Sequence, residues 1–399
     1  MSDHLFEARS EKTYLQQLTS IRGVACLVVL VGHVIQTIRY DPLPPSPHRH
    51  WVRDLVTYAF NAQGAVLLFF VLSGCVLSLS LRRVVTFDWQ TVAGFYVRRA
   101  LRIYPLLWVS VLFSIVVTTY VRASMDIGVY VDWLARNLAS TLSPAHVGLA
   151  LVGAYTRYNG PMWSLRVELI FSILFPGILL LMRARRLRGW ALAGLFAMAL
   201  VPMPSEIGLN FGLAFALGAL IPLMPRIGWA SSALIPVAAT LVLMYDRLAL
   251  GGHAVPEQIY DVIETLAAFV IVRDLYASGR SFGVLTSRTA VRVGEWSYSI
   301  YLLHLPILLL VFDLMQQWMG LPPLLAHPGW SQGLLAVLTI GVTVAVSSLT
   351  YRWVELPLHN IGRGLARRIE HPVTPATGWR NDAAPRPMPS ARMEYERES

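Results

Sequence analysis

The sequence contains few charged residues, a single lysine and two cysteines, and each shortage excludes a class of protein. Charged residues make up 14% of the 399 positions, whereas a soluble domain carries about 25%. The two cysteines, Cys26 and Cys75, both lie inside apolar runs, so the chain has neither a disulfide framework nor the cysteine spacing of a zinc site. The low charge excludes an ordinary soluble globular protein.

The basic residues that are present are almost all arginines placed between apolar runs. Lys12 is the lone lysine, and the formal net charge is +10. A basic chain can bind nucleic acid, but arginines that flank apolar segments are explained by the positive-inside rule of membrane proteins. We therefore expect the lipid bilayer as a partner and no nucleic acid. The polar N-terminus also lacks the cleavage site of a removed signal peptide.

Apolar residues dominate the remaining pattern, at 55% of the chain. They recur in runs of about 20 residues, the length that crosses a hydrocarbon layer about 30 Å thick. We predict an all-α fold, a polytopic membrane bundle of about ten transmembrane helices with a central polar cavity. The expected spans are 17–38, 58–81, 101–121, 163–183, 189–203, 207–224, 229–248, 257–276, 297–318 and 332–353. The weaker segment 131–153 is expected to be interfacial or re-entrant.

Three regions are expected along the chain. Residues 1–13 form a cytoplasmic N-terminal segment, 14–360 the transmembrane domain, and 361–399 a Pro-rich, disordered cytoplasmic tail. An even number of spans places both termini on one side. Arginine clusters recur in alternate loops, which assigns that side to the cytoplasm.

Two polar residues, Arg22 and His33, lie in the first apolar span. Eleven helical steps rotate the chain by about 1100° and advance it by about 16 Å, so both residues share one helix face. Snorkelling to lipid phosphates explains Arg22 equally well. An intramembrane histidine is costly unless it faces a polar partner, so His33 is a candidate catalytic residue, with a structural histidine as the alternative.

A cluster of arginines precedes the third apolar span. Arg99 and Arg102 are three residues apart and share a helix face, and Arg98 is adjacent. They are typical of a positive-inside flank, but arginine also suits phosphate oxygens. A phosphate clamp is therefore the functional hypothesis for this cluster.

Three further stretches place polar groups inside apolar runs. Ser73 precedes a glycine in a run typical of helix packing. Glu168 lies one turn into a span, where it is either solvated at the interface or paired with an inward partner such as a histidine. His304 is a second intramembrane histidine with Tyr301 nearby, and a polar packing network is its alternative role.

These five stretches, in this order, resemble the membrane-bound acyltransferase-3 family over residues 14–360. The matching positions are Arg22 and His33; Phe69, Phe70, Ser73 and Gly74; Arg99, Arg102, Ile103 and Pro105; Trp163, Ser164, Leu165 and Glu168; and 298–306. Two positions depart from the family pattern. Cys75 replaces an aromatic residue, and Leu169 stands where a second acid is often found.

The resemblance implies that an acyl group, often acetyl, passes from cytoplasmic acyl-CoA to a hydroxyl of a surface polysaccharide or lipid-linked glycan. It assigns His33 as the catalytic residue in a bacterial inner (cell) membrane protein without a permanently bound cofactor or metal. We expect His33 to be the general base and Glu168 to orient it. The expected acyl-CoA ligands are Arg22, Arg98, Arg99 and Arg102, and the expected substrate-binding residues are Ser73, Trp163, Ser164, Tyr301 and His304.

Three other hypotheses stay open from the sequence. Cys26 lies near the face of His33 and could carry the acyl group covalently, although buried cysteines are usually inert. A proton-coupled transporter or flippase would also use intramembrane His and Glu, but such proteins often show repeated halves, and none is found here. A non-catalytic relative that acts as a sensor or scaffold would have no need to keep intramembrane charges.

Overall fold

The structure is a computed structural model, and it describes residues 2–38, 54–82, 84, 87–124, 127–204, 207–225, 233–251 and 255–370, with the backbone alone for 2–12. It is 84% helical, and the described residues contain no β-strand. The all-α class predicted from the sequence is confirmed. The predicted tail beyond 370 and most of the loop 39–57 lie outside the described residues.

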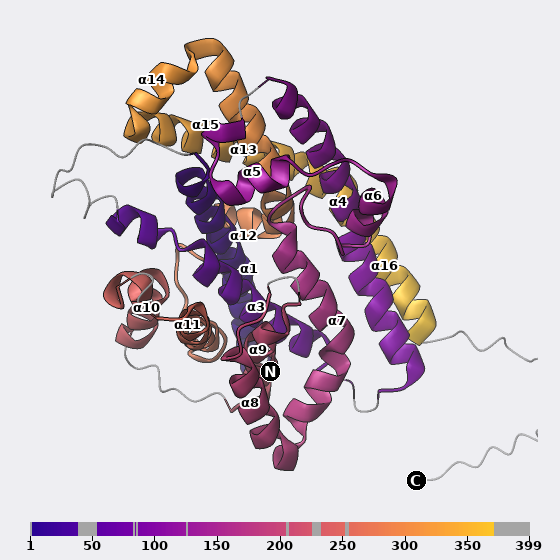
Figure 1. Cartoon of the computed structure of the whole chain (residues 1–399). Helices are drawn as coiled ribbons and strands as arrows, with labels where there is room; N and C mark the ends of the chain where they lie inside the picture. The colour runs from indigo at the N-terminus through magenta and orange to yellow at the C-terminus, as the bar shows by residue number, and fades with distance from the viewer. Residues whose placement is uncertain are drawn as a thin grey trace, which may run out of the picture.

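Helices of very different lengths make up the chain (Figure 1). The long helices are α1 (Ser2–Thr37), α3 (Ala62–Ser80), α4 (Trp89–Ser124), α7 (Met162–Arg183), α11 (Glu257–Ala277), α13 (Ser297–Met319) and α15 (Pro328–Thr350). The shorter helices are α5 (Asp132–Leu138), α6 (Pro144–Leu151), α8 (Arg185–Ala199), α9 (Gly212–Leu220), α10 (Leu234–Ala249), α12 (Arg288–Glu295), α14 (Leu321–Ala326) and α16 (Leu356–Glu370).

Six helices among the described residues are long and apolar enough to cross a membrane. They are Thr13–Thr37, Asp54–Ser80, Trp89–Ser124, Met162–Arg183, Ser297–Met319 and Pro328–Glu370. The other four expected spans coincide with α8 to α11, which are helical but either short or, in α11, interrupted by charged residues. Ten spans therefore remain a prediction, of which six meet the length and composition of a membrane helix.

Helices α1, α3 and α13 lie side by side in the middle of the bundle (Figure 1), with contacts between α1 and each of the other two. Small residues permit the closest approach. A Cβ added to Gly74 of α3 would collide with the carbonyl oxygen of Phe215 in α9, and one on Gly218 would collide with that of Val71. Such contacts let van der Waals packing hold helices together where no hydrophobic driving force acts between them. Gly74 therefore serves helix packing, of which the sequence around it is typical.

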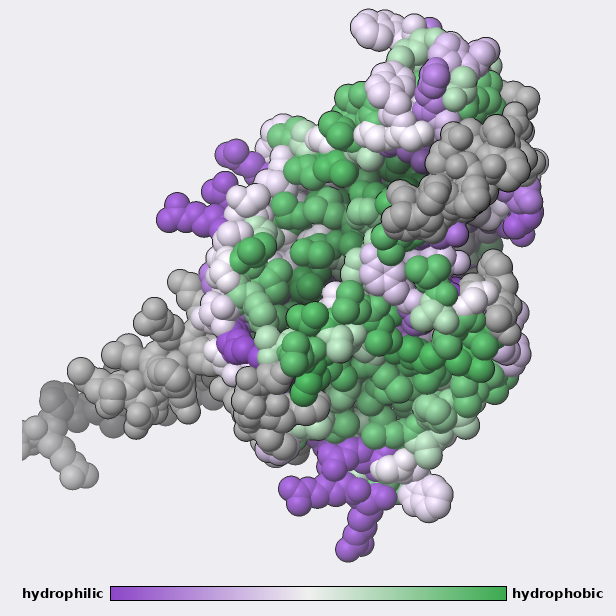
Figure 2. Space-filling model, turned by 90° about the vertical axis from the view of Figure 1, so that its left-hand side faces the viewer, coloured by the Kyte–Doolittle hydropathy of each residue, from purple (hydrophilic) through white to green (hydrophobic). Residues whose placement is uncertain are grey.

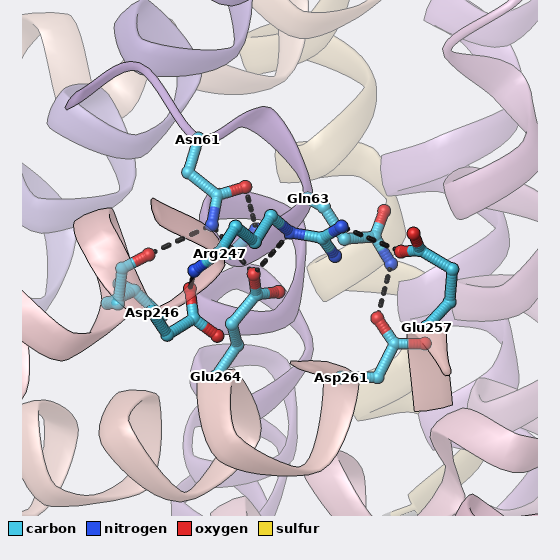
Figure 3. Close-up of polar contacts among 9 residues, drawn as sticks. Asn61, Gln63, Asp246, Arg247, Glu257, Asp261 and Glu264 are labelled. Atoms are coloured by element: carbon cyan, nitrogen blue, oxygen red, sulfur yellow. Dashed lines mark hydrogen bonds and ion pairs between the residues drawn. The ribbon is translucent and has the colours of Figure 1, made fainter. Parts of the chain in front are cut away.

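A buried polar network joins α3 to the hairpin of α10 and α11 (Figure 3). Arg247 of α10 binds Glu264 of α11 at 3.0 Å and Glu257 at 2.6 Å. Asn61 donates to the same Glu264 at 2.7 Å, and its side-chain oxygen caps the first turn of α3 through the amide of Gly64. Polar contacts of this kind fix helices against one another inside a membrane.

Apolar side chains also cover much of the outer surface. They occupy the middle of the face shown in Figure 2, while hydrophilic side chains gather toward its margins. Leu234, Val237 and Leu241 of α10 are each more than half exposed, at 75%, 54% and 54%. Large exposed apolar patches mark a surface that meets another apolar phase, which agrees with a protein embedded in a bilayer.

The last membrane helix continues past its expected end at residue 353. Helix α15 passes through a π-helical turn, Tyr351–Glu355, into α16, which runs to Glu370 and packs along α4. Residues 361–370, expected at the start of the tail, are therefore helical. Gly362 and Ala366 form the buried face of α16. Packing on α4 therefore orders a segment that its composition did not predict to be helical.

Candidate active site

The two intramembrane histidines predicted separately from the sequence face each other. Nε2 of His304 on α13 lies 3.4 Å from Nδ1 of His33 on α1, and the ring centroids are 5.1 Å apart. Trp133 of α5 packs with its ring edge toward His33 at 5.8 Å. His304 is fully buried and His33 is half-buried. His33 therefore points into the protein and keeps some access to its surroundings.

Backbone carbonyls fix the proton position on both rings. Nδ1 of His33 lies 2.9 Å from the carbonyl oxygen of Val29, and Nδ1 of His304 lies 2.7 Å from that of Tyr301. Because a carbonyl oxygen can only accept, Nδ1 carries the hydrogen in each ring. Nε2 of His304 therefore presents a lone pair to His33, and Nε2 of His33 keeps its own lone pair. This tautomer is the one that a general base needs.

A cavity adjoins the histidine pair through Tyr301. Its volume is about 40 Å³. The Tyr301 ring lies 5.8 Å from that of His304, and its hydroxyl is 2.6 Å from the hydroxyl of Ser164. The polar groups that line the cavity are Arg22, Ser73, Ser164, Glu168, Ser297, Tyr298 and Tyr301. Five of these are among the residues predicted for the site.

Glu168 contacts an arginine where we expected a histidine. Its Oε1 accepts from Arg99 at 2.7 Å and from the hydroxyl of Ser73 at 3.4 Å. Arg99 also donates to Ser172 at 2.7 Å. The described hydrogen bonds of Glu168 include none to His33, so the expected direct contact between these two residues is not found, and the side chain that lies beside His33 is His304.

The four arginines of the expected acyl-CoA site fall into two groups. Arg98 is tied to Glu370 of α16, and Arg99 to Glu168. Arg22 and Arg102 form no hydrogen bond or ion pair with any part of the chain that the structure describes. Both lie within electrostatic range of Arg99, Glu168 and Glu355. Two half-buried guanidinium groups without a direct partner among the described residues leave donors available for an anion or water.

A second carboxylate, Glu355, belongs to this charged group and was missed from the sequence. It lies in the π-helical turn before α16 and accepts from the fully buried hydroxyl of Ser299, which in turn accepts from Thr350 at 2.9 Å. It lies two residues past the expected end of the last span, at 353. A π-helical turn is frequent at functional sites. This turn is visible only in the structure, so the sequence offered no signal that pointed to Glu355.

The remaining predicted residues separate into lining and packing positions. Ser164 lines the cavity, whereas Trp163 also packs against Phe211 at 5.7 Å between ring centroids. The thiol of Cys26 is fully buried and donates to the carbonyl of Gly23 at 3.0 Å, an environment typical of packing. Among the described residues, no group of three or more His, Cys, Asp or Glu could hold a metal ion.

Comparison with known proteins gives a consistent result along the whole chain. A family model described as an acyltransferase domain, the acyltransferase-3 model, matches residues 15–352. Acyltransferase MdmB from Streptomyces mycarofaciens is 26% identical over 400 residues, which cover 93% of this chain and 97% of that protein. Nodulation protein 10 from Rhizobium leguminosarum bv. viciae is 27% identical over 199 residues, 47% of this chain and 49% of that protein. No solved structure matches.

Proposed function

This chain belongs to the acyltransferase-3 family and is an acyltransferase, and from this premise we propose that it moves an acyl group from cytoplasmic acyl-CoA to a hydroxyl of a cell-surface or lipid-linked glycan. Acetyl is the proposed acyl group. The proposed location is the inner membrane of a bacterium, with both termini in the cytoplasm. The observation that carries the proposal is the half-buried His33 ring, whose Nδ1 is held and whose Nε2 has no hydrogen-bond partner among the described residues.

In the proposed reaction His33 is the general base. Its Nε2 takes the proton of the acceptor hydroxyl as the oxygen attacks the thioester carbonyl. The new C–O bond forms, the C–S bond breaks, and the proton passes from His33 to the departing coenzyme A thiolate. The reaction is balanced without any oxidant or added proton.

His304 is proposed to hold His33 in place during this cycle. When Nε2 of His33 gains a proton, its Nδ1–H becomes a stronger donor, because a hydrogen bond from a charged donor is about twice as strong as a neutral one. The Val29 carbonyl and the lone pair of His304 Nε2 are the acceptors available to it. His304 thus supplies the contact that a carboxylate supplies in a Ser-His-Asp triad.

Arg22 and Arg102 are proposed to bind the phosphates of acyl-CoA. Guanidinium groups match phosphate oxygens in geometry and charge, and these two lack a partner among the described residues. The hydroxyls of Ser73, Ser164 and Tyr301 line the adjoining cavity, where they could donate to the developing oxyanion. The ion pair of Arg99 with Glu168 would then shape the entrance and leave phosphate binding to the other two arginines.

The test compares surface glycans in a bacterium that lacks this gene and carries it back in three forms. Mass spectrometry is expected to find acylated glycan with the wild type and with His327→Ala, an exposed histidine used as the control. With His33→Ala the acyl group should disappear while membrane levels of the protein stay the same. Acylation at the wild-type level in that variant would reject His33 as the base. Unchanged glycans in the deletion strain would reject the proposed acceptor class.

A further inference from the structure

A second hollow lies on the outside of the bundle, between α4 and α7. Its volume is about 490 Å³, far larger than the cavity of about 40 Å³ beside the histidines. Apolar side chains form most of its wall, among them Ile103, Leu169, Ile170 and Ile173. The rim is exposed, with Ile173 at 65% and Val152 at 56%. We call this hollow the α4–α7 groove; it opens toward the space that lipid chains would occupy.

Two arginines and no carboxylate line the α4–α7 groove. Arg99 is already paired with Glu168. Arg166 lies one turn inside the apolar helix Met162–Arg183 and donates to a single acceptor, the carbonyl of Ala154 at 3.1 Å. No described residue supplies a counter-ion. A guanidinium in a membrane segment is costly without one, so the groove favours an anionic occupant.

We propose that the α4–α7 groove binds a membrane lipid with a phosphate headgroup. The phosphate lies at the guanidinium of Arg166, whose charge and planar geometry suit phosphate oxygens. The acyl chains then run along Leu169, Ile170 and Ile173. A phospholipid joins an anionic headgroup to long alkyl chains, and this combination matches the arginine and the apolar wall of the groove.

The bound lipid also completes the wall of the catalytic cavity. Arg99 lines the groove, and its partner Glu168 lines the cavity with Ser73. One ion pair therefore separates the two spaces. Lipid chains in the groove exclude water from the outer side of this ion pair, where a lower dielectric strengthens it.

The experiment measures lipid binding directly, so its outcome is independent of acyl transfer. The purified full chain is stripped of lipid in detergent and titrated with phosphatidylglycerol or with diacylglycerol of the same chains, and native mass spectrometry counts the bound molecules. We expect one phosphatidylglycerol bound about 10-fold or more tightly than diacylglycerol, since a hydrogen bond to a charged group contributes about 1.5–3 kcal/mol.

Two variants and one control locate the site. Arg166→Gln should remove the preference for phosphatidylglycerol, and Ile170→Trp should weaken both lipids by filling the groove. Arg157→Gln, which changes an exposed arginine in the preceding connection, should behave like the wild type. Equal binding of the two lipids by the wild type, or an intact preference in Arg166→Gln, would overturn the proposal. If Ile170→Trp fails to fold, the Arg166→Gln result decides alone.

Discussion

Three of the four ring nitrogens of His33 and His304 have a hydrogen-bond partner. The fourth, Nε2 of His33, carries a lone pair that can accept a proton. Both Nδ1 atoms donate to backbone carbonyls of their own helices. The pair therefore depends on one contact between helices, from Nε2 of His304 to Nδ1 of His33. Each of the two histidines can be replaced without changing the other, so the proposed roles of His33 and His304 can be tested separately.

Replacing His304 should separate positioning from packing. His304→Leu removes one of the two acceptors for Nδ1 of His33, the one on another helix, and should lower kcat on the order of 10²-fold, with little change in the KM for acyl-CoA. His304→Gln keeps an acceptor oxygen and should recover most of the activity. Equal losses in both variants, together with equal losses of thermal stability, would show that His304 serves packing only.

The unpaired arginines predict a different kinetic signature. Arg102→Gln removes a cation without a protein partner, so it should raise the KM for acyl-CoA about 10-fold, with a smaller effect on kcat. Arg98→Gln is the matched control, because Arg98 is already bound to Glu370. Steady-state kinetics with varied acyl-CoA measure both. Identical KM values in the two variants would mean that Arg102 serves membrane topology and does not bind acyl-CoA.

Helices α3, α10 and α11 are joined at one end by a network of charged and polar side chains. Arg247 bridges two carboxylates and stacks over the ring of Tyr260 at 4.7 Å. Asn61 links the same network to the N-terminal cap of α3. Since α3 also carries Ser73 of the cavity, the network sets the position of an active-site helix from a distance (Figure 3).

Loss of the buried acid should loosen this attachment. Glu264→Leu leaves Arg247 and Asn61 with unsatisfied buried donors, which costs about 1–3 kcal/mol in unfolding free energy. Glu257→Gln changes a 55% exposed partner of the same arginine and should cost less than about 1 kcal/mol. Chemical unfolding in mixed micelles compares them. Similar stabilities for the two variants would mean that the network adds nothing to the packing.

The molecule as a whole has an arginine-rich end at the junction of α7 and α8 and an apolar surface beyond it. Arg183, Arg185, Arg186 and Arg188 lie at this junction. If the positive-inside rule holds, this end faces the cytoplasm, and the connection that holds α6 faces outward. The same orientation places Arg98, Arg99 and Arg102, near the start of α4, toward the side from which acyl-CoA is proposed to come.

Cysteine labelling in intact cells tests this orientation cleanly, because both native cysteines are buried. Ala145→Cys, at an exposed position on α6, should react with a membrane-impermeant maleimide added outside. Arg186→Cys should react only after the membrane is permeabilised. The reverse pattern would invert the proposed topology and remove the cytoplasmic route for the acyl donor.

Composition and spacing alone determined the helical membrane class, the family resemblance and the residues that meet around the cavity. This follows because apolar run length reports on the bilayer, and because His33, Glu168 and His304 are too costly inside a membrane to occur without partners. Which partner each one has was decided only by the tertiary structure. Arg99 pairs with Glu168, His304 lies beside His33, and Glu355 lies in a π-helical turn near the site. Contacts between helices far apart in the chain depend on how the helices pack, and no local pattern in the sequence records that.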